Sequence, residues 1–150
     1  EEFTIQDNNG NPVYKVKGKL LSIGDKLRFQ TMEGEEVALI KQELISLRPS
    51  YRILRQGELQ AEVSKRLLPA IKKKFKVDMK DGSQDLEIKG NILSHEYRFM
   101  RGDEEVAHIS KKWVSLRDAY GIDIDEGEDD VLILACAVVV DMISHGSDDD

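Results

Sequence analysis

Cysteine and positive charge are both scarce in this chain of 150 residues. The single cysteine, Cys136, excludes an internal disulfide, so no part of the fold requires an oxidising compartment. Lysine and arginine total 22 against 29 acidic residues. The resulting net charge of -7 argues against a nucleic-acid partner, because phosphates are neutralised by basic side chains. Residues 1–12 are polar and lack the pattern of a leader peptide, so we expect a cytoplasmic protein.

Catalytic and metal-binding motifs are missing as well. His95, His108 and His145 show no i, i+4 pair and no neighbouring cysteine, which argues against zinc. The sequence also lacks a Gly-x-Ser-x-Gly elbow, so we expect no catalytic residues and no cofactor. The acidic residues from 123 to 130 fail the EF-hand spacing for Ca²⁺. Carboxylates at the start of a helix are the simpler interpretation of that run.

What the sequence does contain is one recurring unit: a short run of alternating apolar residues, a polar turn with glycine, and a second run. Period-2 alternation is typical of antiparallel strands with one buried face. Six such hairpins are visible, and their starts lie 22–24 residues apart, at Phe3, Leu27, Tyr51, Phe75, Tyr97 and Tyr120. A mainly β domain of 150 residues with a single core is therefore predicted.

A longer symmetry relates residues 17–53 to residues 89–122. Lys17, Gly18, Leu21 and Ser22 correspond to Lys89, Gly90, Leu93 and Ser94; Arg28 and Phe29 correspond to Arg98 and Phe99; Ser46, Leu47 and Arg48 correspond to Ser115, Leu116 and Arg117. So many matches in the same order indicate a duplication, with half-repeats at about 3–65 and 75–145 and an acidic tail at 147–150. Duplication of a three-hairpin unit favours a closed sheet without exposed edges.

The sixth hairpin departs from the pattern, because residues 131–143 are apolar on every side except at Asp141. This segment is shorter than the ~20 residues that span a bilayer, so it is expected to be a helix buried inside the sheet. A buried strand remains the alternative, since the three consecutive valines at 138–140 favour strands. Cys136 is expected to pack there as a small apolar side chain. Asp141 is expected either to mark where the helix leaves the sheet or to pair with a buried base, and the first is simpler because an unpaired buried carboxylate is costly.

These residues resemble the LOR (LURP-one-related) family. The resemblance rests on the segment from Val16 to Lys26, on Lys111-Lys112-Trp113, and on the ending from Tyr120 to Ala135, and it covers nearly the whole chain. It implies a tubby-like fold: a closed antiparallel barrel of about twelve strands around a central hydrophobic C-terminal helix. Phospholipid scramblases and tubby proteins share that architecture, and tubby relatives bind phosphoinositides through basic surface residues. Trp113 is expected in the core, with a binding role as the alternative.

One window of this acidic chain is strongly basic. It runs from Ser64 to Val77, contains no acidic residue, and includes Lys65, Arg66, Lys72, Lys73, Lys74 and Lys76. A binding patch for an anionic membrane surface or phosphoinositide is one interpretation. A solvated linker between the half-repeats, broken at Pro69, is the other. We expect a non-catalytic interaction domain, peripheral at a membrane, with a scaffold that binds another protein as the alternative.

Overall fold

The structure of the protein is a computed structural model that describes residues 2–66, 74–113 and 119–146. Eleven strands, one short 3-10 helix and one α-helix follow each other along the chain. The strands are β1 (Glu2–Gln6), β2 (Pro12–Gly18), β3 (Lys26–Thr31), β4 (Glu36–Ile45), β5 (Arg48–Arg55), β6 (Glu58–Arg66), β7 (Lys74–Met79), β8 (Leu86–Asn91), β9 (Glu96–Arg101), β10 (Glu104–Ser110) and β11 (Gly121–Ile124). The helices are η1 (Lys111–Trp113) and α1 (Asp130–Gly146).

All eleven strands belong to one antiparallel sheet in which each strand pairs with its neighbour in sequence. The predicted hairpins account for this order, because five of them supply two strands each and the sixth supplies β11 alone. The prediction of a mainly β fold is therefore confirmed. Since every second strand runs in the same direction, β2, β4, β6, β8 and β10 all lead to the same end of the molecule.

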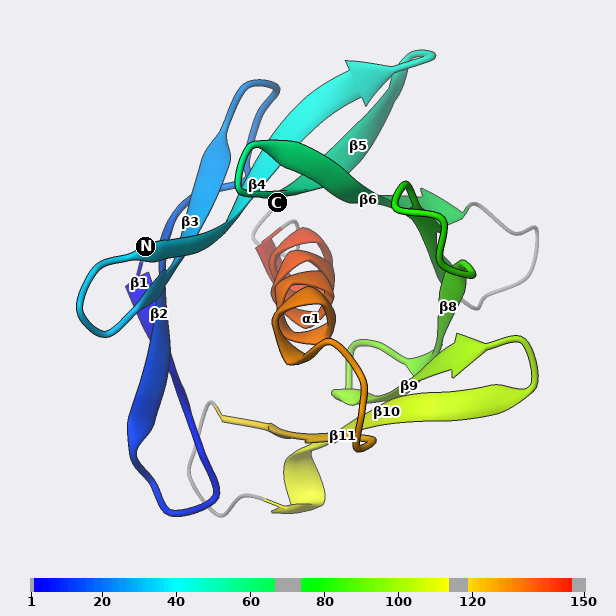
Figure 1. The fold of residues 1–150 in the computed structure, drawn as a ribbon. Helices are drawn as coiled ribbons and strands as arrows, with labels where there is room; N and C mark the ends of the chain where they lie inside the picture. The colour runs from blue at the N-terminus through cyan, green and yellow to red at the C-terminus, as the bar shows by residue number, and fades with distance from the viewer. Residues whose placement is uncertain (1, 67–73, 114–118, 147–150) are drawn as a thin grey trace.

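The predicted closure of the sheet is not confirmed. Among the described residues β1 and β11 are the two edges of the sheet, and no pairing joins them. The strand count is eleven instead of about twelve, because the segment that should form the second strand of the sixth hairpin forms α1. The sheet curls around α1 in Figure 1 without hydrogen bonds between its first and last strands.

Alternation along the strands builds the core. In β7 the side chains of Phe75 and Val77 are buried, whereas Lys74 and Lys76, which alternate with them, are only partly covered. The other strands repeat this pattern with Leu27 and Phe29 in β3 or Tyr97 and Phe99 in β9. Inward positions thus carry apolar side chains and outward positions carry charges, as a sheet with one buried face requires.

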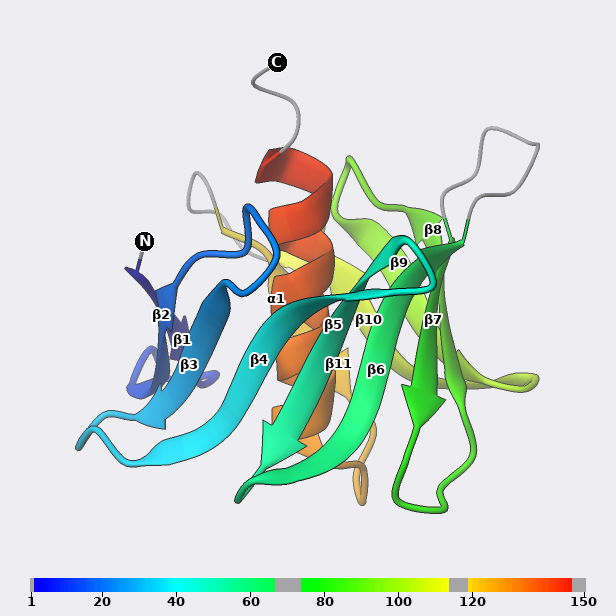
Figure 2. The same ribbon diagram turned by 90° about the horizontal axis from the view of Figure 1, so that it is seen from above.

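The helix α1 occupies the centre of the curled sheet (Figures 1 and 2). Every residue from Val131 to Val140 is buried, and none of these side chains is more than 9% exposed. The small side chains of Ala135, Cys136 and Ala137 are completely buried, so the surrounding strands approach the helix closely. The predicted buried helix is confirmed, and the alternative of a buried strand is wrong. Within the described residues no helix has the length and apolarity needed to cross a membrane.

Candidate functional site

The structure describes only part of the predicted basic window. Lys72 and Lys73 lie outside the described residues, as does the side chain of Arg66. Lys76 contacts two carboxylates, at 3.0 Å from Asp78 Oδ1 and 3.9 Å from Asp85 Oδ2, so its charge is engaged within the protein. Lys74 instead lines a groove on the outer face of the sheet. The predicted patch of six basic residues therefore stays a prediction, because three of its side chains lie outside the described part of the structure.

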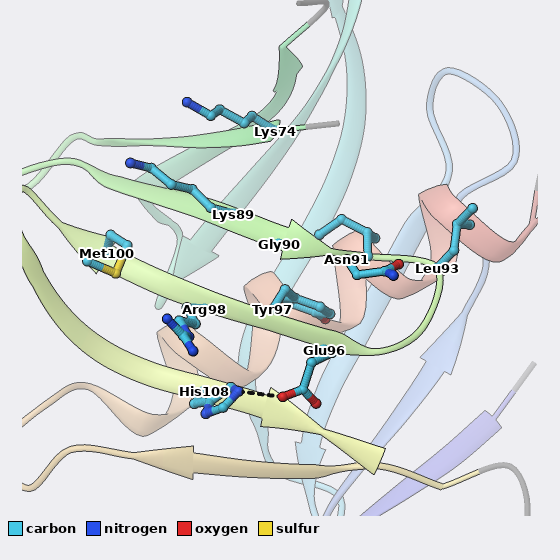
Figure 3. A pocket seen from close by; sticks show the side chains of 11 residues that line it. Lys74, Lys89, Gly90, Asn91, Leu93, Glu96, Tyr97, Arg98, Met100 and His108 are labelled. Carbon is cyan, nitrogen blue, oxygen red and sulfur yellow. Dashed lines mark hydrogen bonds and ion pairs between the residues drawn. The ribbon is translucent and has the colours of Figure 1, made fainter. Parts of the chain in front are cut away.

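The groove has a volume of about 960 Å³ and follows β8 and β9 toward their connection (Figure 3). Its walls come from β7, β8, β9, β10 and the loop after β8; the lining residues are Lys74, Lys89, Gly90, Asn91, Ile92, Leu93, Glu96, Tyr97, Arg98, Met100 and His108. Basic side chains from four neighbouring strands thus meet at one concave surface. Figure 3 shows the side chains of Lys74 and Lys89 extending in the same direction.

Strand register explains why these side chains meet. Lys89 in β8 lies directly opposite Arg98 in β9, and Arg98 lies opposite His108 in β10. On the other side of β8, Phe75 of β7 pairs with Ile88, and continuing this antiparallel register by one residue places Lys74 opposite Lys89. Lys74 in turn pairs with Arg66 of β6. A transverse row of basic residues therefore crosses five strands. Like charges directly opposite each other destabilise a sheet, so this row favours the binding of an anion.

Acidic residues compensate part of this charge. Arg98 Nε lies 3.0 Å from Glu105 Oε1, although both side chains are largely exposed, and such pairs contribute little. His108 Nε2 lies 3.0 Å from Glu96 Oε1. A hydrogen bond from Ser110, followed by the contact with His108, lowers the pKa of the Glu96 carboxyl. Lys89 Nζ lies 3.9 Å from Glu87 Oε2, so Lys89 and Arg98 each have a carboxylate beside them. The lining of the groove itself contains three cationic side chains, Lys74, Lys89 and Arg98, and one carboxylate, Glu96.

A glycine at each of two matched positions allows the strands beside the groove to approach closely. Gly90 has φ +133°, and a Cβ there would lie 2.8 Å from the backbone oxygen of Glu96. Gly18, the matched residue of the first half-repeat, has φ +125°, and its Cβ would lie 2.2 Å from the backbone oxygen of Lys26. No L side chain fits at either place, so glycine is required where β8 meets β9 and where β2 meets β3.

Asp141 follows Val140, the last residue of the uniformly buried run, and is itself only partly covered, in agreement with its predicted place at the end of the enclosed segment. Asp141 Oδ1 also lies 2.8 Å from Nε2 of His95, which belongs to the loop between β8 and β9. The His95 ring also stacks on Tyr120 with 4.7 Å between centroids. The sequence argument left a buried base as the alternative, and nothing in the spacing of residues 95 and 141 indicates that the sheet brings them together. This pair joins the last turns of α1 to the wall of the groove.

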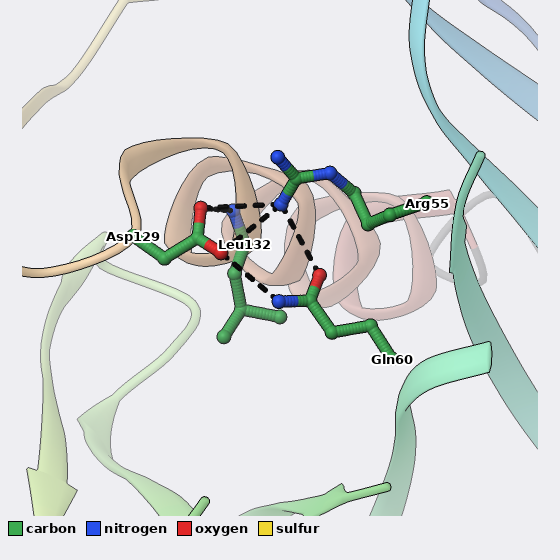
Figure 4. Close-up of polar contacts among 4 residues, drawn as sticks. All are labelled: Arg55, Gln60, Asp129 and Leu132. Atoms are coloured by element: carbon green, nitrogen blue, oxygen red, sulfur yellow. Dashed lines mark hydrogen bonds and ion pairs between the residues drawn. The ribbon is translucent and has the colours of Figure 1, made fainter. Parts of the chain in front are cut away.

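The acidic residues before α1 hold the start of the helix (Figure 4). Asp129 Oδ1 accepts a hydrogen bond from the backbone N–H of Leu132 at 3.2 Å, as an N-cap residue does. Asp129 also accepts hydrogen bonds from Arg55 and Gln60. Glu128 accepts two from Arg101, at 2.7 and 3.0 Å. The interpretation as helix-start carboxylates is confirmed for Asp129.

Two further sequence predictions concern single residues. Cys136 is completely buried, and burial raises the pKa of its thiol, in agreement with a packing role. The side chain of Trp113 lies outside the described residues, so its predicted place in the core stays a prediction. No cluster of three or more potential metal ligands occurs in the described part of the chain.

Sequence reasoning missed Lys89, Arg98 and His108. They are distant from the basic window in sequence and carry acidic neighbours, so no charge run marks them. The sequence did contain one signal, because each of the three residues stands at an outward-facing position in the alternating pattern of its strand. Converting that signal into a site requires the register of β8, β9 and β10, which single-strand patterns do not provide.

A meandering antiparallel sheet curled around one buried C-terminal helix defines the class of fold. Comparison with known proteins agrees, because the sequence profile of the LOR (LURP-one-related) family matches residues 1–141. The chain belongs to this family, as its resemblance implied. It is 31% identical over 150 residues to the uncharacterized protein YxjI of Bacillus subtilis (strain 168), a match that spans 100% of this chain and 90% of YxjI.

A solved structure supports the same fold. The X-ray structure of the Arabidopsis thaliana protein AT5G01750 matches with a TM-score of 0.71, and the match covers 95% of this chain and 85% of that protein. Sequence identity between the two is 21%, so this likeness concerns the fold alone. The arrangement of strands around a helix is thus shared at low identity.

Proposed function

We propose that this protein is a non-catalytic interaction domain that binds anionic phospholipid head groups, with phosphoinositides as the first class to test. The observation that carries the proposal is the transverse row formed by Lys74, Lys89 and Arg98 at a groove of head-group size. Lysine and arginine are the side chains that bind phosphate groups most strongly. A peripheral position on a cytoplasmic membrane surface follows from this function.

The extension of the row to Lys74 beside the groove supports an anionic ligand more than a solvated surface. The opposed pair alone is not sufficient, because Lys17 and Arg28 form the same pair in the first half-repeat without Lys74 or the groove. Lys89 and Arg98 are cross-strand neighbours, and opposite placement of like charges costs stability in a sheet. A phosphate bound between them removes the repulsion and replaces it with charge-assisted hydrogen bonds. Near an anionic bilayer each such residue contributes about 1 kcal/mol to binding, so the row adds about 3 kcal/mol of general attraction to the specific contacts with a head group.

The proposal is tested by sedimentation with vesicles. Wild type is mixed with vesicles of phosphatidylcholine alone, with added phosphatidylserine, or with added phosphatidylinositol bisphosphate, at low and at high salt. Binding is expected only to the anionic vesicles and is expected to weaken with salt. Soluble inositol phosphate, added as a competitor, distinguishes recognition of the head group from attraction to the charged surface.

A matched control exists within the chain. Lys17 and Arg28 occupy the register positions in β2 and β3 that correspond to Lys89 and Arg98 in β8 and β9. The double variant Lys89→Glu/Arg98→Glu is expected to lose binding, whereas Lys17→Glu/Arg28→Glu, with the same change of charge, is expected to keep most of it. Wild type that fails to sediment with every anionic vesicle contradicts the proposal and favours the scaffold alternative.

A further inference from the structure

The two ends of the sheet differ in the residues that connect the strands. In Figure 2 the end at which α1 finishes carries the connections that follow β2, β4 and β8. These connections are residues 19–25, 46–47 and 92–95. The opposite end carries the connections that follow odd-numbered strands, together with the loop that enters α1. We call the first of these the helix-exit end and the second the helix-entry end.

Exposed aliphatic side chains gather at the helix-exit end. Six of the seven exposed large apolar side chains of the described residues lie there: Leu21, Ile23, Leu44, Ile45, Leu47 and Leu93. Only Met32 is found at the helix-entry end. Leu21 and Leu93 are matched positions of the two half-repeats, and both are exposed, at 72% and 52%. A cluster of this kind on one side of a protein marks an interaction surface.

Leu47 is exposed in a backbone conformation that leucine rarely adopts. It is 89% exposed and has φ 66°, and Ser46 before it has φ 51°. Two consecutive positive φ values are the requirement of a type I′ turn, which favours Asn-Gly. Leucine at such a position destabilises the fold and leaves its side chain in water. This combination of strain and exposure indicates that Leu47 serves contact with a partner and not the stability of the fold.

The aliphatic side chains are held on a fixed framework. The loop from Lys19 to Asp25 is joined to β4 by hydrogen bonds from Gly24 N to Gln42 O at 2.8 Å and from Gln42 N to Asp25 O at 2.9 Å. The Asp25 carboxylate accepts the backbone N–H groups of Leu21 and Ser22. Leu21 and Ile23 are therefore placed beside the end of β4, which carries Leu44 and Ile45.

The charge at the two ends identifies the partner. Exposed basic residues accompany the aliphatic side chains at the helix-exit end: Lys19, Lys26, Arg48, Lys111 and Lys112. Four carboxylates described at this end are bound within the protein: Asp25 by backbone N–H groups, Glu43 by Arg52, Glu96 by His108 and Asp141 by His95. The connections of the helix-entry end carry Lys80 alone against ten acidic residues: Asp7, Glu33, Glu35, Asp81, Asp85, Asp103, Asp125, Glu126, Glu128 and Asp129. Aliphatic side chains surrounded by cations fit an anionic bilayer, where the apolar part enters below the phosphates. A symmetric dimer through this end would instead oppose like charges.

We infer that the helix-exit end inserts Leu21, Ile23, Leu44, Leu47 and Leu93 into the interfacial region of an anionic bilayer, with α1 directed toward the membrane. This inference rests on the proposed function and adds the orientation of the bound domain. The groove reaches the same end, since Leu93 belongs both to its lining and to the aliphatic cluster. In Figure 3 the side chains of Lys74 and Lys89 extend away from Leu93, so the groove and the leucines are separate parts of the bound surface.

Insertion is measured with an environment-sensitive fluorophore. The probe is attached to Ser46→Cys at the helix-exit end and, as a control, to Glu33→Cys at the helix-entry end. Cys136 is completely buried, so the unsubstituted chain is expected to take up no label. With phosphatidylcholine–phosphatidylserine vesicles, the probe at position 46 is expected to gain intensity and shift to the blue, while the probe at position 33 stays unchanged.

A second variant measures the contribution of a leucine directly. Leu47→Asn suits positive φ and keeps the fold, yet removes the aliphatic side chain. Its partition onto the same vesicles is expected to fall about tenfold, which corresponds to about 1.4 kcal/mol. The matched control Met32→Asn, at the helix-entry end, is expected to bind as wild type does.

The outcomes separate this inference from the proposed function. Sedimentation of wild type with anionic vesicles, together with an unshifted probe at position 46 and full binding by Leu47→Asn, overturns the inference and leaves head-group binding intact. Absence of any sedimentation overturns both. Self-association of wild type that disappears in Leu47→Asn also overturns the inference, because it assigns the leucines to a second copy of the chain.

Discussion

Two neighbouring hairpins are closed by two-residue turns at opposite ends of the molecule, and the two turns use different chemistry. Gln56-Gly57 joins β5 to β6 at the helix-entry end, with φ values of 52° and 79°. Ser46-Leu47 joins β4 to β5 at the helix-exit end with the same signs of φ, although it has no glycine. In the first turn a glycine adopts one of the two positive φ values without strain. In the second turn a leucine adopts it with strain and is exposed to solvent.

The same contrast extends to the polar contacts of each end. At the helix-entry end, acidic residues are bound by Arg55, Gln60 and Arg101, and these contacts hold the start of α1 to the sheet. At the helix-exit end, lysines and leucines face solvent. The comparison indicates that one end of the sheet stabilises the domain and the other is available for a partner. Substitutions at the two ends should therefore separate stability from binding.

The largest expected effect comes from Arg101. Replacing Arg101 with Met removes both hydrogen bonds to Glu128 and leaves this carboxylate without its cation. A hydrogen-bonded contact with a charged group contributes about 1.5–3 kcal/mol to stability, and both side chains are partly exposed to solvent. The free energy of unfolding is therefore expected to fall by about 2 kcal/mol. Urea denaturation measures the change. Arg98→Met serves as the control, because its exposed pair with Glu105 should cost less than about 1 kcal/mol.

Exchanging the residues of the two turns tests the comparison directly. Gly57→Leu places a leucine at positive φ and is expected to lower the free energy of unfolding by about 1–2 kcal/mol. Leu47→Gly is expected to raise it by less than about 1 kcal/mol, because relief of strain is partly offset by the greater freedom of glycine in the unfolded chain. Both values come from denaturation curves of the two variants. A clear loss of stability in Leu47→Gly would show that Leu47 packs against the protein and would contradict the contrast between the ends.

The helix cap gives a smaller effect. Asp129→Ala removes the hydrogen bond to the Leu132 N–H and the contacts with Arg55 and Gln60. Loss of an N-cap side chain costs about 0.5–2 kcal/mol, and thermal unfolding should detect it as a lower midpoint. Asp130→Ala, one residue further on in the first turn, is the matched control. An equal shift in the two variants would attribute the effect to the helix dipole instead of to the cap.

Low pH is expected to reduce the stability of the protein modestly through two carboxylates at the helix-entry end, Glu128 and Asp129. Hydrogen bonds from Arg101 lower the pKa of Glu128. Burial acts to raise the pKa of Asp129, but hydrogen bonds from Gln60 and Leu132 and the charge of Arg55 outweigh it, so this pKa is lowered too. The unfolded chain therefore takes up protons first as the pH falls. The stabilisation is complete above about pH 5 and is lost as the pH falls through the folded pKa values.

The pH effect is measured by urea denaturation at several pH values between about 7 and 3. Wild type should lose stability toward the acidic side. The loss should be smaller in Arg101→Met, because the arginine that lowers the pKa of Glu128 in the folded protein is then missing. Identical pH profiles for the two proteins would mean that other carboxylates cause the acid sensitivity.

Much of the fold could be predicted from local pattern. Alternation marked the outward and inward faces of the strands, as the burial of Phe75 and Val77 illustrates. The apolar segment after residue 130 was recognised as an internal helix because it has no polar side. Asp129 was recognised among the helix-start carboxylates by its position before an apolar run. These features depend on the neighbours of a residue in sequence, and those neighbours are visible in the printed chain.

The candidate site could be predicted only in part, because its residues are joined by register. Lys74 was among the predicted residues, but Lys76, two positions later, is bound by Asp78. Lys89 and Arg98 were overlooked, since each is separated from the basic window by a hairpin turn. A pattern of charges along the chain cannot indicate which strands will lie side by side at which offset.

The sequence by itself determined which residues are inside and which are outside, because the period of two in strands and the uniformly apolar helix follow from local geometry and from the removal of apolar surface from water. Only the tertiary structure decided that β1 and β11 do not pair with each other among the described residues, that His95 reaches Asp141, and that the exposed leucines share one end. Such relations depend on how the sheet curls and on the direction of each strand. They arise between segments far apart in the chain, where no local preference acts.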